Sequence, residues 1–440
     1  MIEDASGFRG EAEQLFVPER DTEVAAILAR ASAESTPVTI AGAGTGLTGG
    51  RVAEGGWSLS MEKFRRIQIL EGHAIAGAGV TLQELQEAAA PSRQFYPPDP
   101  TERTASVGGS IATNASGSRS YRYGSTRRWV NGLRVGLING SIIEVRRGEP
   151  VDFDVPLLPA PNTTKNTAGY PLRPGMDWVD LFVGSEGTLG VILEADLRLE
   201  PTPDELLSGV IFFASDDAAL DAVDAWRGLD TLRMIEYFDG NSLRFLRGRY
   251  SEVPRNAAAA VLIEQIGEDT APWEPYAEGD SWFALTPTDR ERFRAFRHAL
   301  PEMVNDLMRR RGFLKLGSDF AVPIGRNREM LRFYHHCLAA ARLDYVIFGH
   351  IGDAHVHVNI LPNSPEQFEA GKRLMLDFAR EAVSLGGTVS AEHGLGKRKS
   401  GLLSIQFTAA EIESMKAVKR RLDPKWLLGR GNIFGTAAST

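Results

Sequence analysis

The feature that most constrains the fold is a glycine run: five glycines fall within residues 42–50, directly after a short strand predicted at 37–40. Glycine has no Cβ and allows positive φ, so consecutive backbone N–H groups can converge on an anion. So many glycines also raise the entropic cost of folding, which favours a function over mere flexibility. The run therefore predicts a phosphate-binding loop, made of Gly42, Gly44, Gly46, Gly49 and Gly50.

The spacing Gly44-x-Gly46-x-x-Gly49 matches the letters of the dinucleotide fingerprint found in nicotinamide enzymes. That fingerprint requires a helix to begin at the loop, with an acidic residue about 20 positions later. Residues 51–56 carry two further glycines and do not have a helical pattern. A nicotinamide site on a Rossmann fold is therefore disfavoured.

Two more segments of small and amide residues follow, at 106–117 and 183–192. Each is a weak signal alone. Together with the glycine run they are typical of loops that line a large, flat cofactor carrying phosphate groups.

Length and composition limit the number of domains, the kinds of partner and the location of the protein. A chain of 440 residues favours two or three domains, and the two prolines in residues 200–203 indicate a boundary. The formal charge is 49 − 57 = −8, which argues against a nucleic-acid partner. The single cysteine, Cys337, cannot form an internal disulfide or hold an iron–sulfur cluster. No apolar stretch approaches the roughly 20 residues of a membrane helix, so we expect a soluble, cytoplasmic protein, with peripheral contact at the inner membrane left open.

The periodicity predicts an α+β protein. Thr81 and Glu84 form a capping-box signature for a helix at 82–90. Residues 97–128 show no sustained period and are predicted as loop, whereas Asn139-Gly140 predicts a hairpin between strands 132–139 and 141–146. The remaining predicted helices lie at 18–34, 216–227, 288–311, 325–342 and 365–385, and further strands at 58–61, 67–70, 74–78, 208–213, 259–266 and 345–350.

Half of the eight histidines lie in two short segments, 350–357 and 392–393. On a strand, His355, His357 and Asn359 share one face. His350 is seven residues before His357, so only a turn, for which Gly352-Asp353 is suited, would bring it to the same face. Two imidazoles and a carboxylate are typical of a catalytic divalent metal, zinc first and manganese or iron next.

These segments, in this order, resemble the FAD-binding domain of the vanillyl-alcohol oxidase/p-cresol methylhydroxylase superfamily, and most of all its D-lactate, D-2-hydroxyglutarate and glycolate dehydrogenase branch. The resemblance covers nearly the whole chain. It implies a two-subdomain FAD-binding domain of the p-cresol methylhydroxylase type (1–202), an α+β cap domain with an antiparallel sheet (203–405) and a C-terminal segment returning to the FAD domain (406–440). The matching motifs are 41–50, 77–80, 98–100, 107–117, 123–124, 182–192, 348–359, 390–396, 423–424 and 431–434.

The resemblance also implies that FAD is the cofactor. The glycine run would bind its pyrophosphate, residues 106–117 would run along the flavin and its phosphates, and Asn432 would lie near the isoalloxazine. The matching segments hold no convincing histidine or cysteine for covalent attachment, so we expect non-covalent FAD. The expected contacts are Ala43, Gly44, Thr45, Gly46, Leu47, Thr48, Gly49, Pro98, Ser106, Gly108, Gly109, Thr113, Asn114, Ser116, Gly187, Gly190, Ile192 and Asn432.

The family pattern maps the metal ligands onto His350, His357 and Glu392. It makes His393 the base that takes the hydroxyl proton while hydride moves from C2 to flavin N5, and Asn359 a substrate contact. The chain departs from the family at His355, where Asn or another small polar residue is usual. A chelate by His355 and His357 therefore stays open.

The substrate carboxylate needs a cation, and arginine is favoured for its bidentate geometry. Arg297 loosely matches the family's substrate arginine. Where relatives often carry a lysine this chain has Gly317, with Lys315 two residues earlier. Two interpretations of Lys315 stay equally open: a substrate ligand and an ordinary surface lysine.

The resemblance thus implies an FAD-dependent enzyme that oxidises a 2-hydroxy acid of the D-lactate, glycolate or D-2-hydroxyglutarate type. Without cysteine clusters, its electrons would pass to a separate acceptor, such as a quinone, a cytochrome, an electron-transfer flavoprotein or oxygen. One alternative is the ether-lipid enzyme of the same superfamily, alkylglycerone-phosphate synthase, which uses FAD without net oxidation. The other is a non-catalytic FAD-carrying subunit, which would be expected to lack the histidine–glutamate cluster. A homodimer is one oligomeric state compatible with the sequence.

Overall fold

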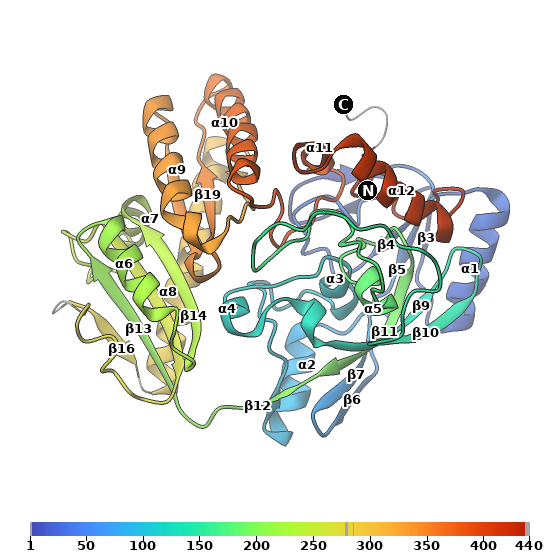
Figure 1. The fold of residues 1–440 in the computed structure, drawn as a ribbon, viewed down its shortest axis with the longest axis horizontal. Coiled ribbons are helices and arrows are strands. Elements are labelled where there is room, and N and C mark those ends of the chain that lie inside the picture. The colour runs from blue at the N-terminus through green and yellow to red at the C-terminus, as the bar shows by residue number, and fades with distance from the viewer. Residues whose placement is uncertain (1, 278–279, 285, 436–440) are drawn as a thin grey trace.

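The computed structural model describes residues 2–277, 280–284 and 286–435, which form two lobes side by side (Figure 1). The first lobe holds the N-terminal half of the chain and also receives its C-terminal helices. The second lobe is built from the segment between them. A short connection near β12 (Glu200–Pro201) joins the lobes at one edge.

The first lobe contains two main sheets. One is a three-stranded parallel sheet in the order β3-β5-β4, and the other is a five-stranded antiparallel sheet in the order β10-β9-β11-β7-β6. The predicted hairpin is confirmed as β9 and β10, although its connection is longer than the two residues expected. The strands are β3 (Gln14–Phe16), β4 (Val38–Ala41), β5 (Trp57–Ser60), β6 (Ile67–Leu70), β7 (His73–Gly77), β9 (Val130–Gly136), β10 (Ile142–Arg146) and β11 (Val191–Arg198). Two-stranded pairs join β1 (Ile2–Glu3) to β2 (Arg9–Gly10) and β8 (Gln94–Phe95) to β12.

In the first lobe, the helix predicted from a capping signature begins where the signature places it. The capping box at Thr81 and Glu84 is present and opens α2. The prediction of an uninterrupted loop over 97–128 is wrong, because Ser106 caps a short helix by accepting a hydrogen bond from the Gly109 amide. Helices of four to six residues are too short to show a hydrophobic period. The helices are α1 (Asp21–Glu34), α2 (Leu82–Ala89), α3 (Val107–Ala112), α4 (Ser120–Tyr123) and α5 (Trp178–Phe182).

The second lobe is organised around a seven-stranded antiparallel sheet in the order β16-β13-β15-β14-β18-β19-β17. Its middle strand β14 was not predicted. Three charged residues, Arg233, Glu236 and Asp239, interrupt its apolar pattern, yet all are buried. The strands are β13 (Leu206–Phe213), β14 (Leu232–Asp239), β15 (Ala259–Ile266), β16 (Trp282–Ala284), β17 (Leu316–Gly317), β18 (Tyr345–His350) and β19 (His355–Ile360).

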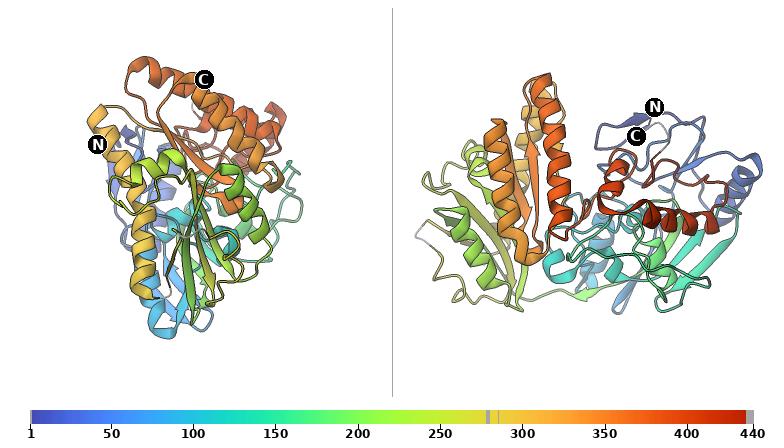
Figure 2. Two further views of the ribbon diagram at one scale, coloured as in Figure 1. Left: turned by 90° about the vertical axis from the view of Figure 1, so that its left-hand side faces the viewer. Right: turned by 45° about the horizontal axis from the view of Figure 1, so that its top comes forward.

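Helices cover both faces of this sheet (Figure 2). Phe293 and Phe296 of α8 pack on one face with Phe212 and Phe238 of the strands. The opposite face packs against the other group of helices through residues such as Phe378. The helices are α6 (Asp216–Trp226), α7 (Gly240–Leu246), α8 (Pro287–Arg311), α9 (Asn327–Ala341) and α10 (Pro365–Ser384). Among the described helices, none combines the length and apolar composition needed to cross a membrane.

The C-terminal residues lie on the first lobe (Figure 1). After α11 (Leu403–Gln406) and α12 (Ala409–Leu422), the chain runs beside β4, where the Val38 amide donates to the Leu427 carbonyl over 2.8 Å. The Lys419 ammonium of α12 is buried, lies 2.9 Å from Asp423 Oδ2, and donates to the Thr188 carbonyl over 2.8 Å. This lysine fastens the C-terminal segment to the loop before β11.

We expect Lys419→Met to lower the free energy of unfolding by about 3–5 kcal/mol, because it leaves the Asp423 charge buried without a counter-charge. Arg420→Met, one residue on, breaks only an exposed ion pair with Glu413 and should cost less than about 1 kcal/mol. Urea unfolding followed by circular dichroism measures both. Equal losses in the two variants would contradict this role for Lys419.

Candidate active site

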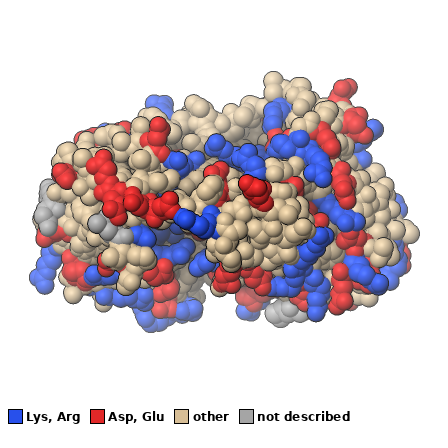
Figure 3. Space-filling model, turned by 90° about the horizontal axis from the view of Figure 1, so that it is seen from below, with Lys and Arg blue, Asp and Glu red and all other residues tan. Residues whose placement is uncertain are grey.

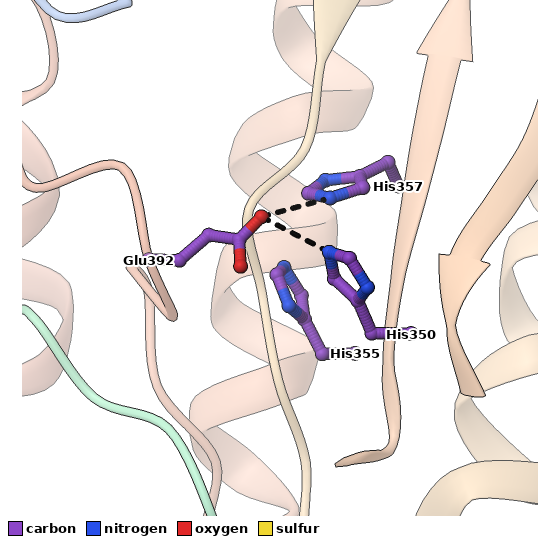
Figure 4. Close-up of side chains that lie close together, drawn as sticks. All are labelled: His350, His355, His357 and Glu392. Carbon is purple, nitrogen blue, oxygen red and sulfur yellow. Dashed lines mark hydrogen bonds and ion pairs between the residues drawn. The ribbon is translucent and has the colours of Figure 1, made fainter. Parts of the chain in front are cut away.

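The histidine cluster is assembled by a hairpin. Strand β18 ends at His350, a 3₁₀ turn (Ile351–Asp353) reverses the chain, and β19 begins at His355. In this register His350 lies opposite His355, and Phe348 opposite His357. The turn predicted at Gly352-Asp353 is confirmed, and the three imidazoles face one another (Figure 4).

Glu392 approaches the hairpin from the loop after α10. Its Oε1 atom lies 3.1 Å from His350 Nε2 and 3.3 Å from His357 Nε2. Figure 4 shows these two contacts converging on one carboxylate oxygen. The candidate ligand atoms of His350, His355, His357 and Glu392 all lie within 4.8 Å of one another. Such spacing permits one metal ion to contact several of them.

Each of the two histidines facing Glu392 is oriented by a contact to its other nitrogen. His350 Nδ1 lies 2.5 Å from Glu236 Oε1, and His357 Nδ1 donates to the Ser318 carbonyl over 3.1 Å. Glu236 in turn accepts a hydrogen bond from Arg297 Nε at 2.8 Å. Burial alone would lower the pKa of His350, but the Glu236 charge raises it to about 8. The pattern leaves both Nε2 atoms directed at Glu392.

His355 differs from its neighbours. Its Nδ1 atom lies 3.5 Å from the Lys165 ammonium, so this nitrogen must be the unprotonated one. Its Nε2 atom lies 3.2 Å from Asp319 Oδ1, close but not aligned for a good hydrogen bond. Burial, reinforced by His357, lowers the pKa of His355 to about 3. Both ring nitrogens therefore face groups other than Glu392 Oε1.

His393 lies beside the cluster, its ring stacked on that of His357 with centroids 5.3 Å apart. Its Nδ1 atom is 3.5 Å from Asp319 Oδ1, and its Nε2 atom is 3.8 Å from Glu392 Oε1. Asp319 also accepts hydrogen bonds from the His393 amide and the Ser390 hydroxyl, at 2.9 and 2.8 Å. Burial lowers the pKa of His393 to about 4, so the imidazole is neutral near pH 7.

Two residues of the first lobe complete the cluster, and sequence reasoning missed the role of both. Lys165 Nζ and Ser116 Oγ lie 3.1 and 2.9 Å from Glu392 Oε2. Ser116 was predicted as a cofactor contact instead. Lys165 lies in a polar segment without periodicity or glycine, so no local signal marked it. Asp319 was likewise missed, although its neighbours were noted.

The predicted substrate residues come from three places: Asn359 from β19, Lys315 from the residue before β17, and Arg297 from α8. Asn359 pairs with Gly317 across β17 and β19, and a Cβ on Gly317 would approach the Asn359 amide oxygen to 3.5 Å. Lys315 is partly buried, which lowers its pKa, and it makes no ion pair within the described part of the chain. Arg297 contacts Glu236 and also donates from Nη1 to the Thr101 hydroxyl of the other lobe, over 3.3 Å.

A cavity of about 220 Å³ opens at the seam between the lobes. Arg297 lies on its wall, so the cavity adjoins the contact that orients His350. Seen from below, acidic and basic side chains are mixed over both lobes (Figure 3). Residues that line the cavity include Thr101 and Arg119 of the first lobe and Arg294, Arg297 and His298 of α8.

The glycine run forms an open loop. Ala43 N lies 3.4 Å from Ser106 Oγ, and the Gly49 amide donates to Asp4 Oδ2 over 2.7 Å. Between them, the amides of residues 44–48 donate to no acceptor in the described residues. Gly44 has φ +87°, and a Cβ there would collide with the Arg51 guanidinium, whose buried Nε also has no hydrogen-bond partner.

The other predicted cofactor residues lie around this loop. Asn432 Nδ2 donates to the carbonyls of Gly50 and Glu186, at 3.0 and 2.9 Å, so it joins the glycine run to the segment containing Gly187. A Cβ on Gly108 would clash with Ala78. The remaining members occupy α3 and its cap (Ser106, Gly109), the segment after it (Thr113, Asn114), a buried loop (Pro98) and the start of β11 (Gly190, Ile192).

An open glycine cradle in one lobe and a histidine–carboxylate cluster at the seam define a cofactor-dependent enzyme. Residues 12–146 match the model of an FAD binding domain, and residues 202–433 match that of the C-terminal domain of FAD linked oxidases. The chain belongs to the family of FAD-linked oxidases and is an FAD-linked oxidoreductase. The FAD-binding domain and the resemblance expected from the motifs are thereby confirmed, and the antiparallel sheet expected in the second half is present in the structure.

Curated relatives extend over nearly the whole chain. A D-lactate dehydrogenase from Archaeoglobus fulgidus is 32% identical, covering 94% of this chain and 90% of the relative. The glycolate oxidase subunit GlcD of Bacillus subtilis is 30% identical, with 96% and 89% covered. A D-2-hydroxyglutarate dehydrogenase from Xanthomonas citri pv. viticola is also 30% identical, with 96% and 89% covered. Among solved structures, an alkyldihydroxyacetonephosphate synthase shares the fold, with a TM-score of 0.68 at 16% identity over 94% of this chain and 75% of that one.

Proposed function

We propose that the protein oxidises a 2-hydroxy acid, of the D-lactate, glycolate or D-2-hydroxyglutarate type, to the 2-oxo acid. The observation that carries this proposal is the convergence of His350, His357 and Glu392 beside the neutral imidazole of His393. The names of the relatives support it. When bound, FAD supplies a hydride acceptor at N5, and a divalent metal supplies a Lewis acid that makes the substrate hydroxyl more acidic.

The first lobe has what FAD requires. Five consecutive amides, at residues 44–48, have no other acceptor and suit the pyrophosphate. The unpartnered Nε of Arg51 beside Gly44 adds positive charge to the same loop. We propose non-covalent binding through the segments around 43–49, 106–116, 187–192 and Asn432. We further propose that the parallel and antiparallel sheets are the two subdomains of an FAD-binding domain at 1–202, with a cap at 203–405 and a returning segment at 406–440.

The second lobe has a donor set that suits zinc, with manganese or iron next. We propose His350, His357 and Glu392 as the ligands, because Glu236 and the Ser318 carbonyl occupy the Nδ1 atoms and leave both Nε2 atoms toward Glu392 Oε1. Without metal, the raised pKa of His350 means that its imidazole carries a second proton near pH 7. Metal binding at Nε2 would release that proton. Because Lys165 lies beside Nδ1 of His355 and Asp319 lies beside its Nε2, we propose His350 rather than His355 as the partner of His357.

His393 is suited to take the hydroxyl proton. Asp319 lies beside Nδ1 and holds the backbone of the same residue, which directs Nε2 toward the cluster. Because burial keeps the imidazole neutral, Nε2 has a free lone pair near pH 7. His393 would hold the proton at Nε2 while C2 loses hydride.

Three residues are proposed to bind the substrate's polar groups. Arg297 uses Nε and Nη1 for Glu236 and Thr101, which leaves Nη2 for a carboxylate. Lys315 has no ion pair in the described ranges, and Gly317 carries no side chain between it and the Asn359 amide oxygen. Asn359 would donate from β19.

Electrons would pass to a separate acceptor, which is a quinone, a cytochrome, an electron-transfer flavoprotein or oxygen. We propose that the enzyme is cytoplasmic, with peripheral access to the inner membrane. A homodimer is one proposed assembly. The ether-lipid alternative is supported by fold similarity alone. A non-catalytic subunit is disfavoured by the cluster's ordered contacts.

The proposed reaction is tested by the anaerobic visible spectrum of the purified flavoprotein. We expect one acid among D-lactate, L-lactate, glycolate and D-2-hydroxyglutarate to bleach the flavin, and EDTA treatment to prevent bleaching until metal is restored. A flavin that none of these acids bleaches would favour the ether-lipid or non-catalytic alternatives. Folded protein without flavin would overturn the cofactor proposal itself.

The cradle is tested by Gly44→Val, with Gly148→Val as the matched control. The two glycines have nearly equal φ angles, +87° and +86°, so the backbone strain is alike, but a Cβ on Gly148 meets nothing within 4 Å. Gly44→Val should weaken FAD binding to the apoprotein at least about tenfold, or about 1.4 kcal/mol. Quenching of FAD fluorescence measures the affinity, and equal affinities in both variants would count against the cradle.

The ligand set is tested by metal titration of metal-free protein. His350→Ala and His357→Ala should each weaken zinc binding by more than about 100-fold, beyond the range for outer contacts. His355→Asn, which installs the residue usual in the family, should keep the affinity within about tenfold. Retention of zinc by His350→Ala with loss in His355→Asn would transfer the site to the other chelate.

A further inference from the structure

Lys165 is a buried cation at the centre of the cluster, although it belongs to the first lobe. Its side chain is 1% exposed. Its ammonium lies 3.1 Å from Glu392 Oε2, 3.4 Å from Asp353 Oδ2 and 3.5 Å from His355 Nδ1. A fourth contact, at 3.5 Å, is to the Gly117 carbonyl. A lysine this buried requires such partners, because its charge cannot reach water.

The two oxygens of Glu392 have separate partners. Oε1 faces His350, His357 and His393, whereas Oε2 is held by Lys165 and Ser116. Of the Lys and Arg side chains that the structure describes, Lys165 alone pairs with this carboxylate. Its charge therefore keeps Oε2 turned away from the point where the imidazoles converge.

The lysine is itself fixed by the junction of the lobes. Thr164 Oγ1 donates to Asp353 Oδ1 over 2.8 Å, and the Thr167 amide donates to the Ser390 carbonyl over 2.8 Å. Residues 164 and 167 thus bind the turn of the hairpin and the loop that carries Glu392. Lys165, between them, reaches Glu392 only when the lobes are docked.

We propose that Lys165 is a positioning residue that restricts Glu392 to a single metal-binding oxygen and so keeps one coordination position open for the substrate. This inference rests on the metal site of the proposed function. A catalytic metal needs an open position. Without the lysine, Oε2 is free to turn onto the same ion, and a carboxylate bound through both oxygens would fill the place that the substrate's hydroxyl requires.

Loss of Lys165 should affect metal binding differently from loss of a ligand. Loss of a ligand or of the scaffold would release the metal, whereas loss of Lys165 removes a neighbouring positive charge and frees a second carboxylate oxygen. Lys165→Met should therefore retain the metal and lose the open position. A retained metal with a closed site separates positioning from a merely structural role.

The experiment uses holoenzyme loaded with Mn²⁺, in which enhanced relaxation of water protons reports open coordination positions. Lys165→Met should bind Mn²⁺ as tightly as wild type or more tightly, show a lower relaxation enhancement, and raise KM at least about tenfold, as expected for an outer contact of a metal ligand. Ethylammonium ions added to Lys165→Ala should restore the enhancement in part. Ser116→Ala, which frees the same oxygen with little change in volume, should show a smaller decrease.

Lys419→Met is the matched control, because it removes a buried lysine far from the cluster; it should lower stability and leave the enhancement unchanged. Loss of Mn²⁺ affinity and FAD together in Lys165→Met would make the lysine structural and overturn the proposal. Unchanged enhancement and KM in Lys165→Met and Ser116→Ala would also overturn it. Wild-type protein that binds no Mn²⁺ or zinc would instead overturn the metal site on which the inference rests.

Discussion

The carboxylate of Glu392, whose side chain is only 11% exposed, is the group around which the two lobes are joined. Its charge lies away from water, so partners must compensate it, and these come from both lobes: Lys165 and Ser116 from the first, His350 and His357 from the second. A buried charge that lost its partners would cost several kcal/mol. The docking of the lobes and the geometry of the histidines therefore depend on the same carboxylate.

The same logic extends outward through two further carboxylates. Glu236 lies between His350 and Arg297, and Arg297 reaches Thr101 on the opposite lobe. Asp319 holds the backbone of Glu392 and His393 and lies beside the ring of His393. Each carboxylate thus orients one imidazole and one neighbouring element.

Sequence reasoning reached the parts of the fold and site that short-range rules control. The glycine run, the capping box at Thr81 and the turn between His350 and His355 follow from local conformational preferences. The family resemblance, carried by motif order, was confirmed by comparison with known proteins, and the residue roles that it implies remain predictions. Strand β14 escaped notice because its charged residues are compensated by distant partners.

Lys165 and Asp319 escaped for a related reason. A buried lysine is recognisable only from the carboxylates that surround it, and those of Lys165 lie about 190 and 230 positions away in the sequence, at Asp353 and Glu392. Short helices such as α3 depend on one cap at Ser106 rather than on a repeated pattern. Buried charged residues and short helices such as these depend on contacts between distant segments or on a single cap, so the periodicity of one sequence does not predict them.

The imidazole of His355 fits this network. A small polar residue at that position would leave Lys165 and Asp319 without the imidazole that lies between them, since Nδ1 faces the lysine and Nε2 faces the carboxylate. Because the pKa of His355 is held low, the ring remains neutral and separates the two charges without adding a third. His355 therefore lies between Lys165, which contacts Glu392, and Asp319, which contacts His393.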